Sequence, residues 1–508
     1  MFENQPKGLW TLALANTGER FGYYTMLAVF ALFLGENFGF SASVASEVYS
    51  WFLAAVYFLP LFGGMAADKW GYNKMVIIGI SIMFLGYLFL SIPLGGGTVA
   101  IAAMGAALLL VSLGTGFFKG NLQVMVGDLY NEERYASQRD SGFSLFYMAI
   151  NIGALFAPTA ATAIMAWAQN SLGYSKADSY HFAFAVACVS VIVSIIIYFL
   201  GRPTYKHVIA PVSKEKRNED LKEYVKDEIG DTPSDTKERI VCLCLVFAVV
   251  IFFWMAFHQN GLTLTWFADE FTARSASGAT GMAFNVINLV WCIFIMFGVC
   301  GLFTAQKYNL KTVLTNAALV VIPAAILVYT YLHSASESVS IAAPIFQQFN
   351  PCFVVALTPV SIALFSWLGK KGKEPKAPVK IGLGMLVAAV AYVWLTVSCL
   401  GLPTPNQPEH LADMDPNILI RTYLILTFAE LLLSPIGISF VSKVAPTKYK
   451  GMMMGGWFVA TAIGNKLVSI PGHMWDMPLP VVWGVLAVIC LVAALFIFSI
   501  IKKLNKVS

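Results

Sequence analysis

The fold is decided by an apolar run close to the start of the chain, which reads WTLALANTGERFGYYTMLAVFALFLG over residues 10–35. A helix needs about 20 apolar residues to cross about 30 Å of hydrocarbon, so this run is long enough to span a membrane. It carries Glu19 and Arg20, although a charged side chain at the centre of a span costs about 2.5–3.5 kcal/mol on insertion scales. These two side chains must therefore face the inside of a helix bundle, and the run predicts a membrane protein with several spans.

The composition of the whole chain agrees with this prediction. Of the 508 residues, 58% are hydrophobic and only 12% are charged, whereas a typical soluble domain carries about 25% charged residues. So few charges cannot cover a water-facing surface, which excludes a soluble multidomain enzyme, and the high hydrophobicity excludes an intrinsically disordered chain. The apolar residues form long unbroken runs rather than alternating segments, which excludes an outer-membrane β-barrel.

Fourteen such runs are predicted to span the membrane, which gives an all-α polytopic membrane protein. They cover residues 10–35, 44–66, 75–95, 98–120, 141–168, 181–201, 239–267, 281–305, 310–333, 339–369, 380–402, 418–444, 452–472 and 479–501. The longest polar stretch separates the first six runs from the last eight. We therefore expect an N-terminal six-helix lobe over residues 1–201, a cytoplasmic linker over 202–238 and a C-terminal lobe over 239–508. Residues 213–229 of the linker are either a surface amphipathic helix or part of a solvated charged tether.

The distribution of Lys and Arg predicts the orientation. If the N-terminus lies inside, the outer loops hold only Lys176 and Arg274, and the other loop cations lie inside. We therefore expect both termini in the cytoplasm. Residues 1–8 show no removable signal peptide, and this, with the compact loops, favours a bacterial inner membrane. The eight cysteines lie in apolar runs and are expected to be small hydrophobic side chains, without disulfides or a metal site.

A short loop between the second and third runs indicates the superfamily. Residues 63–71 read GGMAADKWG, in which glycines allow two helices to approach closely and an Asp and a Lys cap the turn at the membrane surface. The loop resembles the G-x-x-x-D-(R/K)-x-G loop of the major facilitator superfamily. Two six-helix lobes joined by a basic cytoplasmic loop are also the arrangement of that superfamily. The resemblance implies a major facilitator fold, here with two extra transmembrane helices as a hairpin at about 281–333.

Ionisable side chains inside the predicted spans mark a candidate site. They are Glu19, Arg20, Lys119, His258 and Glu430, with Lys466 as a sixth candidate. Two cations and one carboxylate in the N-terminal lobe leave a net charge of +1, which an anion would balance, while Glu430 has no basic neighbour in sequence and would be balanced by a cation. A zwitterion of dipeptide length supplies both charges. The alternative is a buried ion cluster that only fixes the packing of the helices.

Residues 16–24 read NTGERFGYY and resemble the E-x-x-E-R-F-x-Y-Y motif of the proton-dependent oligopeptide transporters, the POT or PTR2 family. Further matches to motifs of this family follow in chain order, at residues 146–153, 252–259, 346–351, 430–437 and 456–465. The resemblance implies a secondary active transporter that imports di- and tripeptides by alternating access, with the proton gradient as energy source and no other cofactor. It implies no catalytic residues, no metal and no nucleic-acid partner, and a chain that works as a monomer in the lipid bilayer.

The resemblance also assigns roles to side chains. Arg20 and Lys119 would hold the terminal carboxylate of the peptide, and Glu430 would hold its amino terminus with help from Asn151 and Asn350. Side-chain pockets would be lined by aromatic residues, namely Tyr23, Tyr24, Tyr57, Trp254, Trp457 and Phe458. Contacts to both termini recognise groups that every peptide carries, and aromatic walls accept many side chains. Broad specificity is therefore expected.

Three residues depart from the family pattern. Asn16 stands where the family has a glutamate tied to proton coupling, Leu27 where many members have an arginine, and His258 where many have a glutamate. That arginine and glutamate can pair across the lobes, so we expect such a gate on the outer side to be absent here. The remaining candidates for proton coupling are Glu19, His258 and Glu430, although His258 can instead be a neutral histidine hydrogen-bonded in the core. The extra hairpin also follows the seventh span, whereas bacterial members usually carry it between spans six and seven.

Several functions stay open at this level. The alternatives are a proton-independent peptide facilitator, a transporter of a modified peptide or other small solute, and a peptide-sensing receptor that has lost transport. Nitrate is disfavoured as the solute because Glu430 is retained. The chain contains no HExxH, GxSxG or P-loop motif, which argues against a membrane enzyme.

Overall fold

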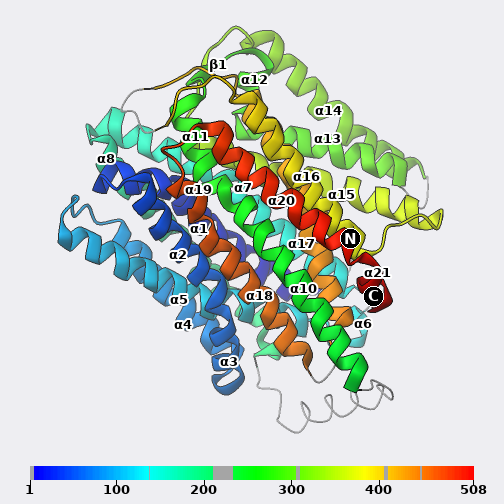
Figure 1. Ribbon diagram of the computed structural model, residues 1–508. Coiled ribbons are helices and arrows are strands. Elements are labelled where there is room, and N and C mark those ends of the chain that lie inside the picture. Colours follow the sequence, from blue (N-terminus) through cyan, green and yellow to red (C-terminus); the bar gives the residue numbers. More distant parts are fainter. Residues whose placement is uncertain are drawn as a thin grey trace.

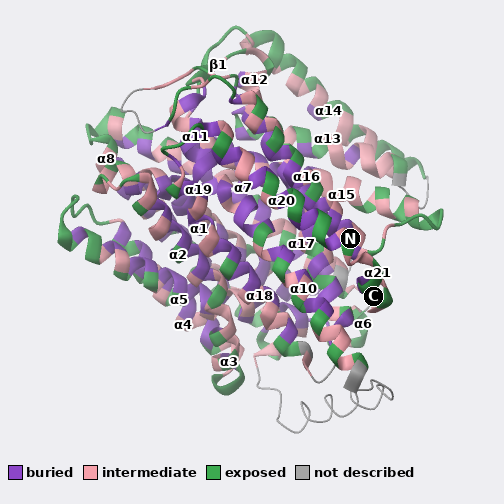
Figure 2. Cartoon of the chain, in the orientation of Figure 1, coloured by how far each residue is buried: buried purple, intermediate pink, exposed green. Residues whose placement is uncertain are grey.

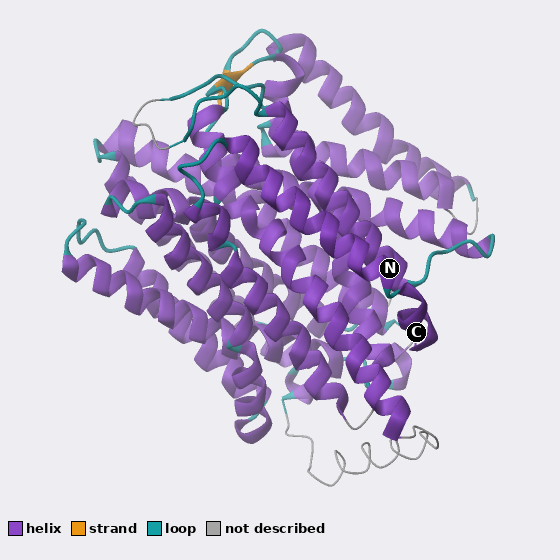
Figure 3. Ribbon diagram, in the orientation of Figure 1, coloured by secondary structure: helices purple, strands orange, loops and turns teal. Residues whose placement is uncertain are grey.

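The computed structural model of the chain describes residues 5–136, 138–209, 233–304, 309–405, 410–446 and 449–507. Within these residues the chain is a bundle of long helices, with one short pair of strands at one end (Figure 1, Figure 3). Twelve helical segments in this part of the chain are long and apolar enough to cross a membrane. Two further long helices, α1 (Lys7–Phe38) and α18 (Lys450–Leu467), carry charged residues and complete the fourteen spans expected from the sequence.

The N-terminal lobe contains α1 and the helices that follow it. They are α2 (Ala42–Phe58), α3 (Pro60–Trp70), α4 (Tyr72–Leu90), α5 (Thr98–Asp128), α6 (Glu133–Ala136), α7 (Arg139–Leu172) and α8 (Lys176–Leu200), followed by the 3-10 turns η1 (Arg202–Thr204) and η2 (Lys206–Val208). Local signals set their ends: Gly39 and Gly173 adopt the left-handed conformation after α1 and α7, and the Ser175 hydroxyl accepts a hydrogen bond at the start of α8. Helix α1 packs on α7 and α8, and α4 packs on α5 and α8.

The C-terminal lobe begins with α10 (Pro233–Phe257). Its further elements are η3 (His258–Gly261), α11 (Thr263–Phe271), β1 (Ser275–Ala276), α12 (Gly278–Ala283), α13 (Val286–Thr304), α14 (Leu310–Ser334), β2 (Val339–Ser340), η4 (Ala343–Gln348), α15 (Phe349–Lys370), α16 (Ala377–Ser398), α17 (Asn417–Val444), α18, α19 (Ser469–His473), α20 (Leu479–Ser499) and α21 (Ile501–Val507). The two strands pair antiparallel, with Ser275 opposite Ser340. Helix α16 packs on α17 and α20, and α10 packs on α18.

The extra pair of helices, α13 and α14, lies at the edge of the bundle (Figure 2). Helix α13 packs on α15 and on α14, whereas α14 packs chiefly on α13. In the most apolar window of α14 only 6% of the residues are buried, against 50% in that of α5. The hairpin thus packs against the outside of the two-lobed core, near the position expected from the sequence.

Some boundaries differ from those expected from the sequence. Helix α5 continues to Asp128, past the expected end at residue 120, because Leu122, Met125 and Val126 extend its buried face at helical spacing. The run expected over residues 281–305 is split into α12 and α13. The linker expected over residues 202–238 is described only at its two ends, and its candidate amphipathic helix at 213–229 lies outside the described residues.

The helix ends define two faces of the bundle. We name the α3 face after the end at which α3, α6 and α21 lie, together with the first residues of α1 (Figure 1). The α19 face is the opposite end, where α1 ends at Phe38, α2 begins at Ala42 and α19 lies. The lobes meet where α2 packs on α18 and α19, where α1 packs on η3, η4 and α11, and where α7 packs on η4 and α15.

Candidate functional site

A cavity of about 320 Å³ lies between the two lobes. It is lined by α1, α2, α5 and α7 of the N-terminal lobe and by α10, η3, η4, α15, α17 and α18 of the C-terminal lobe. The structure brings every side chain that the sequence proposes for substrate binding to this cavity, namely Arg20, Tyr23, Tyr24, Tyr57, Lys119, Asn151, Trp254, Asn350, Glu430, Trp457 and Phe458. Of the candidates for proton coupling, His258 and Glu430 line the cavity, whereas Glu19 lies behind Arg20.

The wall formed by α1 contains an ion pair between two side chains of the protein. Arg20 Nε and Nη2 donate to the two carboxylate oxygens of Glu19, each at 2.5 Å, and the two side chains are 2% and 0% exposed. The Arg20 guanidinium also lies 4.7 Å from the ring centroid of Tyr23. Both oxygens of Glu19 are therefore used inside the protein, while Arg20 still reaches the cavity.

Lys119 supplies the second cation of this wall, from α5. Its Nζ lies 4.5 Å from the ring centroid of Tyr57, a cation–π contact with α2. Among the described residues, no carboxylate lies within ion-pair distance of Lys119. The pair of Glu19 and Arg20 is neutral as a unit, so Lys119 leaves this wall with the unbalanced positive charge that the sequence predicts.

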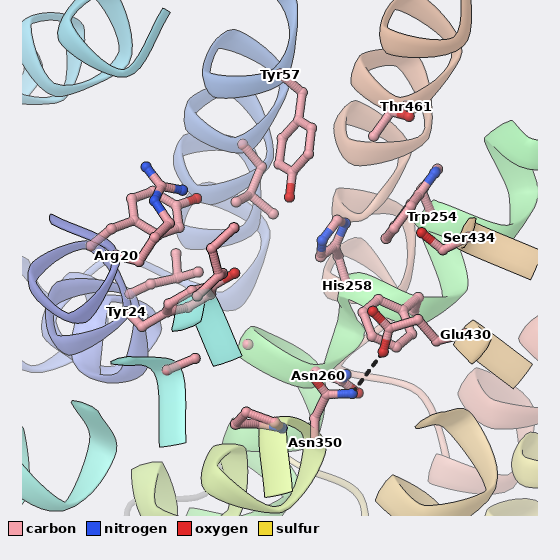
Figure 4. A pocket seen from close by; sticks show the side chains of 18 of the residues that line it. Arg20, Tyr24, Tyr57, Trp254, His258, Asn260, Asn350, Glu430, Ser434 and Thr461 are labelled. Carbon is pink, nitrogen blue, oxygen red and sulfur yellow. Dashed lines mark hydrogen bonds between the residues drawn. The ribbon is translucent and has the colours of Figure 1, made fainter. Parts of the chain in front are cut away.

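The opposite wall carries a carboxylate. Glu430 lies on α17 and is 8% exposed. Asn350 of α15 donates from Nδ2 to Glu430 Oε2 at 3.0 Å (Figure 4). The same nitrogen donates to the Thr427 hydroxyl at 3.0 Å. No cation in the described part of the chain pairs with Glu430. Its negative charge is therefore oriented by an amide but is left without a counter-ion.

The other expected amide, Asn151, is differently placed. Its Nδ2 donates to the Tyr147 carbonyl of the same helix, α7, at 3.1 Å. It lines the cavity, but its donor is satisfied by its own backbone. The structure thus brings Asn151 and Asn350 to one cavity and shows contact with Glu430 for Asn350.

Aromatic rings connect the charged walls. The His258 ring stacks on Trp254 with centroids 5.0 Å apart and lies 5.8 Å from the Tyr57 ring (Figure 4). His258 Nδ1 lies 2.6 Å from Asn465 Oδ1, an oxygen that can only accept, so the histidine donates this hydrogen bond. Such a contact is compatible with a neutral core histidine and with one that gains a proton on its other nitrogen.

The three departures from the family pattern take different positions. Leu27 lines the cavity, as does His258. Asn16 is 3% exposed and lies away from the cavity, and its Nδ2 is without a hydrogen-bond partner among the described residues. The position that would carry a coupling glutamate is thus a buried amide in this chain.

Sequence reasoning missed several residues at the site. Further side chains that line the cavity include Tyr49, Gln123, Tyr147, Asn260, Gln347, Ser434 and Thr461. Gln347 donates to the Ala28 carbonyl of α1 and to the Thr265 hydroxyl of α11, both at 3.0 Å, and so joins the lobes. Gln347 lies inside the family motif at residues 346–351, so this motif could have identified it. Away from the cavity, Glu47 was also missed, although it is an ionisable residue within the span expected over residues 44–66.

The arrangement can bind two opposite charges at once. Cationic groups face the cavity from α1 and α5, a carboxylate faces it from α17, and aromatic rings lie between them. Charge-assisted hydrogen bonds to both ends of a zwitterion, with apolar walls around its middle, match this geometry. No group of His, Cys, Asp and Glu suited to a metal ion was found within the described residues.

Comparisons with known proteins all indicate one family. The model described as "PTR2: POT family" matches residues 73–222 and 287–477, which is more than half of the chain. The chain is 26% identical over 502 residues to a di-/tripeptide transporter of Lactococcus lactis subsp. lactis (strain IL1403), covering 92% of this chain and 89% of that protein. It is 26% identical over 514 residues to the dipeptide and tripeptide permease B of Salmonella typhimurium, covering 96% of this chain and 92% of the permease.

Solved structures share the fold. A peptide transporter POT in complex with sulfate gives a TM-score of 0.73 at 22% identity, covering 100% of this chain and 96% of that chain. A POT family transporter in complex with 5-aminolevulinic acid gives a TM-score of 0.74 at 20% identity, covering 99% of this chain and 98% of that chain. The two-lobed fold with extra helices that the sequence predicts is thereby confirmed.

Proposed function

Since this chain belongs to the POT family, and is therefore a multi-pass membrane transporter rather than an enzyme, we propose that it imports di- and tripeptides by alternating access. In this proposal the lobes of residues 1–201 and 239–508 move relative to each other around the cavity, joined by the linker of residues 202–238. The peptide carboxylate is bound by Arg20 and Lys119, and its ammonium group by Glu430 with Asn350.

One observation carries the proposal, which is the separation of charge across the cavity. The unbalanced cation comes from the N-terminal lobe, and the unbalanced carboxylate comes from the C-terminal lobe. A zwitterion neutralises both only when it touches both lobes, so its binding favours a state in which the lobes close around it. A ligand with one charge leaves the other wall unbalanced.

Orientation and energy source belong to the same proposal. We place the α3 face in the cytoplasm, because Lys69 and Lys74 lie at that end while Lys176 and Arg274 are the loop cations of the α19 face. The protein then lies in a bacterial inner membrane with both termini inside and works as a monomer. The inward proton gradient drives accumulation, and the groups able to carry the proton are Glu19, His258 and Glu430.

The test is uptake of a labelled dipeptide into proteoliposomes, with and without an inward proton gradient and in counterflow. Accumulation above equilibrium only with the gradient supports a proton-coupled importer. Counterflow without accumulation means a facilitator. Dipeptide binding with no flux in either format favours a receptor, and no binding at all means that the substrate is a modified peptide or another solute.

Blocked peptides sharpen this test. An N-acetylated dipeptide lacks the ammonium group that faces Glu430, and a dipeptide amide lacks the carboxylate that faces Arg20 and Lys119. Both should compete at least about tenfold less well than the free dipeptide, since each loses a charge-assisted hydrogen bond. Equal competition by all three would contradict the assignment of the two charged walls.

A further inference from the structure

A second polar cluster joins the lobes, away from the cavity. Glu47 of α2 accepts a hydrogen bond at each carboxylate oxygen, from Lys466 Nζ of α18 at 2.8 Å and from His473 Nε2 of α19 at 2.7 Å. The other ring nitrogen of His473 lies 2.5 Å from the Ser43 hydroxyl, one turn earlier on α2. We name Glu47, Lys466 and His473 the Glu47 latch.

The Glu47 latch lies at the α19 face, beyond the end of the cavity. Tyr49 and Leu53 follow Glu47 along α2 and line the cavity. The Tyr49 hydroxyl packs so closely on Gly261 of η3 that a Cβ at residue 261 would lie 2.0 Å from it. The Leu53 carbonyl accepts from Asn465 Nδ2 at 3.4 Å. Two layers of contact between the lobes therefore separate the cavity from the α19 face, and the latch is the outer one.

Backbone packing beside the latch leaves little space. A Cβ at Gly472 of α19 would lie 2.2 Å from the Ser46 Cβ of α2. The glycine thus lets α19 rest directly on α2, next to Glu47. A separation of α2 from α18 and α19 at this face would break both bonds to Glu47.

The exposure of the Glu47 latch suits a contact that opens and closes. The side chains of Glu47, Lys466 and His473 are 37%, 27% and 42% exposed, whereas Glu19 and Arg20 are 0% and 2% exposed. Partly exposed ion pairs are weak because water competes for both charges, while breaking a buried pair leaves charges without solvent. A weak pair between lobes can break in every cycle without a large barrier.

We propose that Glu47 is the gating carboxylate of this protein. Bound to Lys466 and His473, it holds the cavity shut at the α19 face. Released from them, it lets α2 move away from α18 and α19, so that the cavity opens there. The statement that this opening admits a peptide rests on the proposed function, but the gating itself does not.

Accessibility of the cavity from the α19 face tests the latch directly. Ser434→Cys places a thiol in the cavity wall. Its reaction with a membrane-impermeant maleimide is measured in right-side-out and in inside-out vesicles, above the labelling of the unsubstituted chain, so that the reagent reaches the α19 face in one of the two whichever way the chain is oriented. Glu47→Gln in this background should raise the labelling rate about threefold or more, because a modest contact is lost. Lys466→Glu should raise it further, because two carboxylates then face each other. The charge swap Glu47→Lys with Lys466→Glu should bring the rate back toward that of the parent.

A matched control is available on the same face. Glu36 and Lys176 form an ion pair of 2.6 Å with side chains 39% and 50% exposed, but they join α1 and α8 of one lobe. Glu36→Gln should therefore leave labelling unchanged. His473→Gln should raise the labelling rate, as Glu47→Gln does. In every variant, labelling is normalised to the amount of protein that elutes as a folded species.

The outcomes separate the latch from the proposed function, because the maleimide assay uses no peptide. Increased labelling that the charge swap reverses supports the latch, even in a protein that takes up no dipeptide. Labelling that is unchanged in Glu47→Gln, Lys466→Glu and His473→Gln overturns it, even in a protein that transports dipeptides well. An equal increase in Glu36→Gln also overturns it, since the effect then follows surface charge rather than contact between the lobes.

Discussion

Glu19 and Glu430 are the two buried carboxylates of the described chain, and they have opposite surroundings. Glu19 is fully buried, and Arg20 donates to both of its oxygens. Glu430 is nearly as buried at 8% exposed but accepts only from the Asn350 amide, and no cation of the described chain pairs with it. The first charge is satisfied by the protein, and the second is available to a ligand.

This difference separates a structural charge from a binding charge. A buried carboxylate without a counter-ion is costly, and a chain retains it where a ligand supplies the missing charge. A carboxylate that accepts hydrogen bonds from a cation at both oxygens does not need the charge of a ligand. Its removal instead leaves the buried cation without a counter-ion. The same substitution, Glu to Gln, should therefore have opposite consequences at the two positions.

Glu19→Gln should have the largest effect, and on stability. It leaves the Arg20 guanidinium buried next to Lys119 without its counter-ion, and loss of one partner of a buried ion pair costs about 3–5 kcal/mol. We expect a strongly lowered apparent Tm and a low yield in detergent, measured by thermal unfolding without substrate. Arg20→Met with Glu19→Gln removes both charges and should recover part of this loss. An unchanged Tm in Glu19→Gln would contradict the structural role of the pair.

Glu430→Gln should leave the Tm nearly unchanged and reduce transport. Gln can still accept the hydrogen bond from Asn350, but it presents no charge to an ammonium group. A hydrogen bond to a charged group contributes about 1.5–3 kcal/mol, so uptake of a free dipeptide at low concentration should fall about 10- to 150-fold. Uptake of an N-acetylated dipeptide should change much less. An equal fall for both peptides would mean that Glu430 acts on transport itself rather than on the amino terminus.

The sequence predicts the polarity of the cavity because charged residues in a span have few permitted directions. Arg20, Lys119 and Glu430 all had to face the interior, and the structure brings them to one cavity. Five of the six aromatic residues lie in the family motifs, whereas Tyr57 lies outside them. These inferences need only the direction in which a side chain points, which helical periodicity supplies.

The partners of these charges could not be predicted in the same way. Lys466 was recognised as a candidate charged residue inside a span, but its partner Glu47 lies 419 residues earlier in the chain. His258 likewise binds Asn465, 207 residues later. Such pairs depend on the depth and rotation of one helix against another, which side-chain packing decides and hydropathy does not record. For this reason the sequence predicts the loss of one gate but does not reveal the Glu47 latch.

Asn350→Ala should weaken substrate binding by less than Glu430→Gln. It removes the amide that orients Glu430 but leaves the charge in place, and one such hydrogen bond contributes about 1 kcal/mol, or about fivefold in KM. Thr427→Val is the matched control, because Asn350 then keeps its bond to Glu430 while it loses the one to Thr427. Asn350→Ala and Thr427→Val with equal effects on KM would show that the bond to Glu430 is not the important one.

Tyr57→Leu should have the smallest effect, and on the cationic wall. It removes the ring that lies 4.5 Å from Lys119 Nζ, a contact that contributes about 0.5–1 kcal/mol, so KM for a free dipeptide should rise about two- to fivefold. Tyr57→Phe keeps the ring and loses only the hydroxyl, so it should resemble the wild type. If Tyr57→Phe is as impaired as Tyr57→Leu, the hydroxyl rather than the ring acts at this wall, and Lys119 is held by something other than the cation–π contact. The other informative result is that only Tyr57→Leu raises KM, and that it raises KM less for a dipeptide amide than for the free dipeptide. The ring then positions Lys119 for the carboxylate, as Asn350 positions Glu430 for the ammonium group.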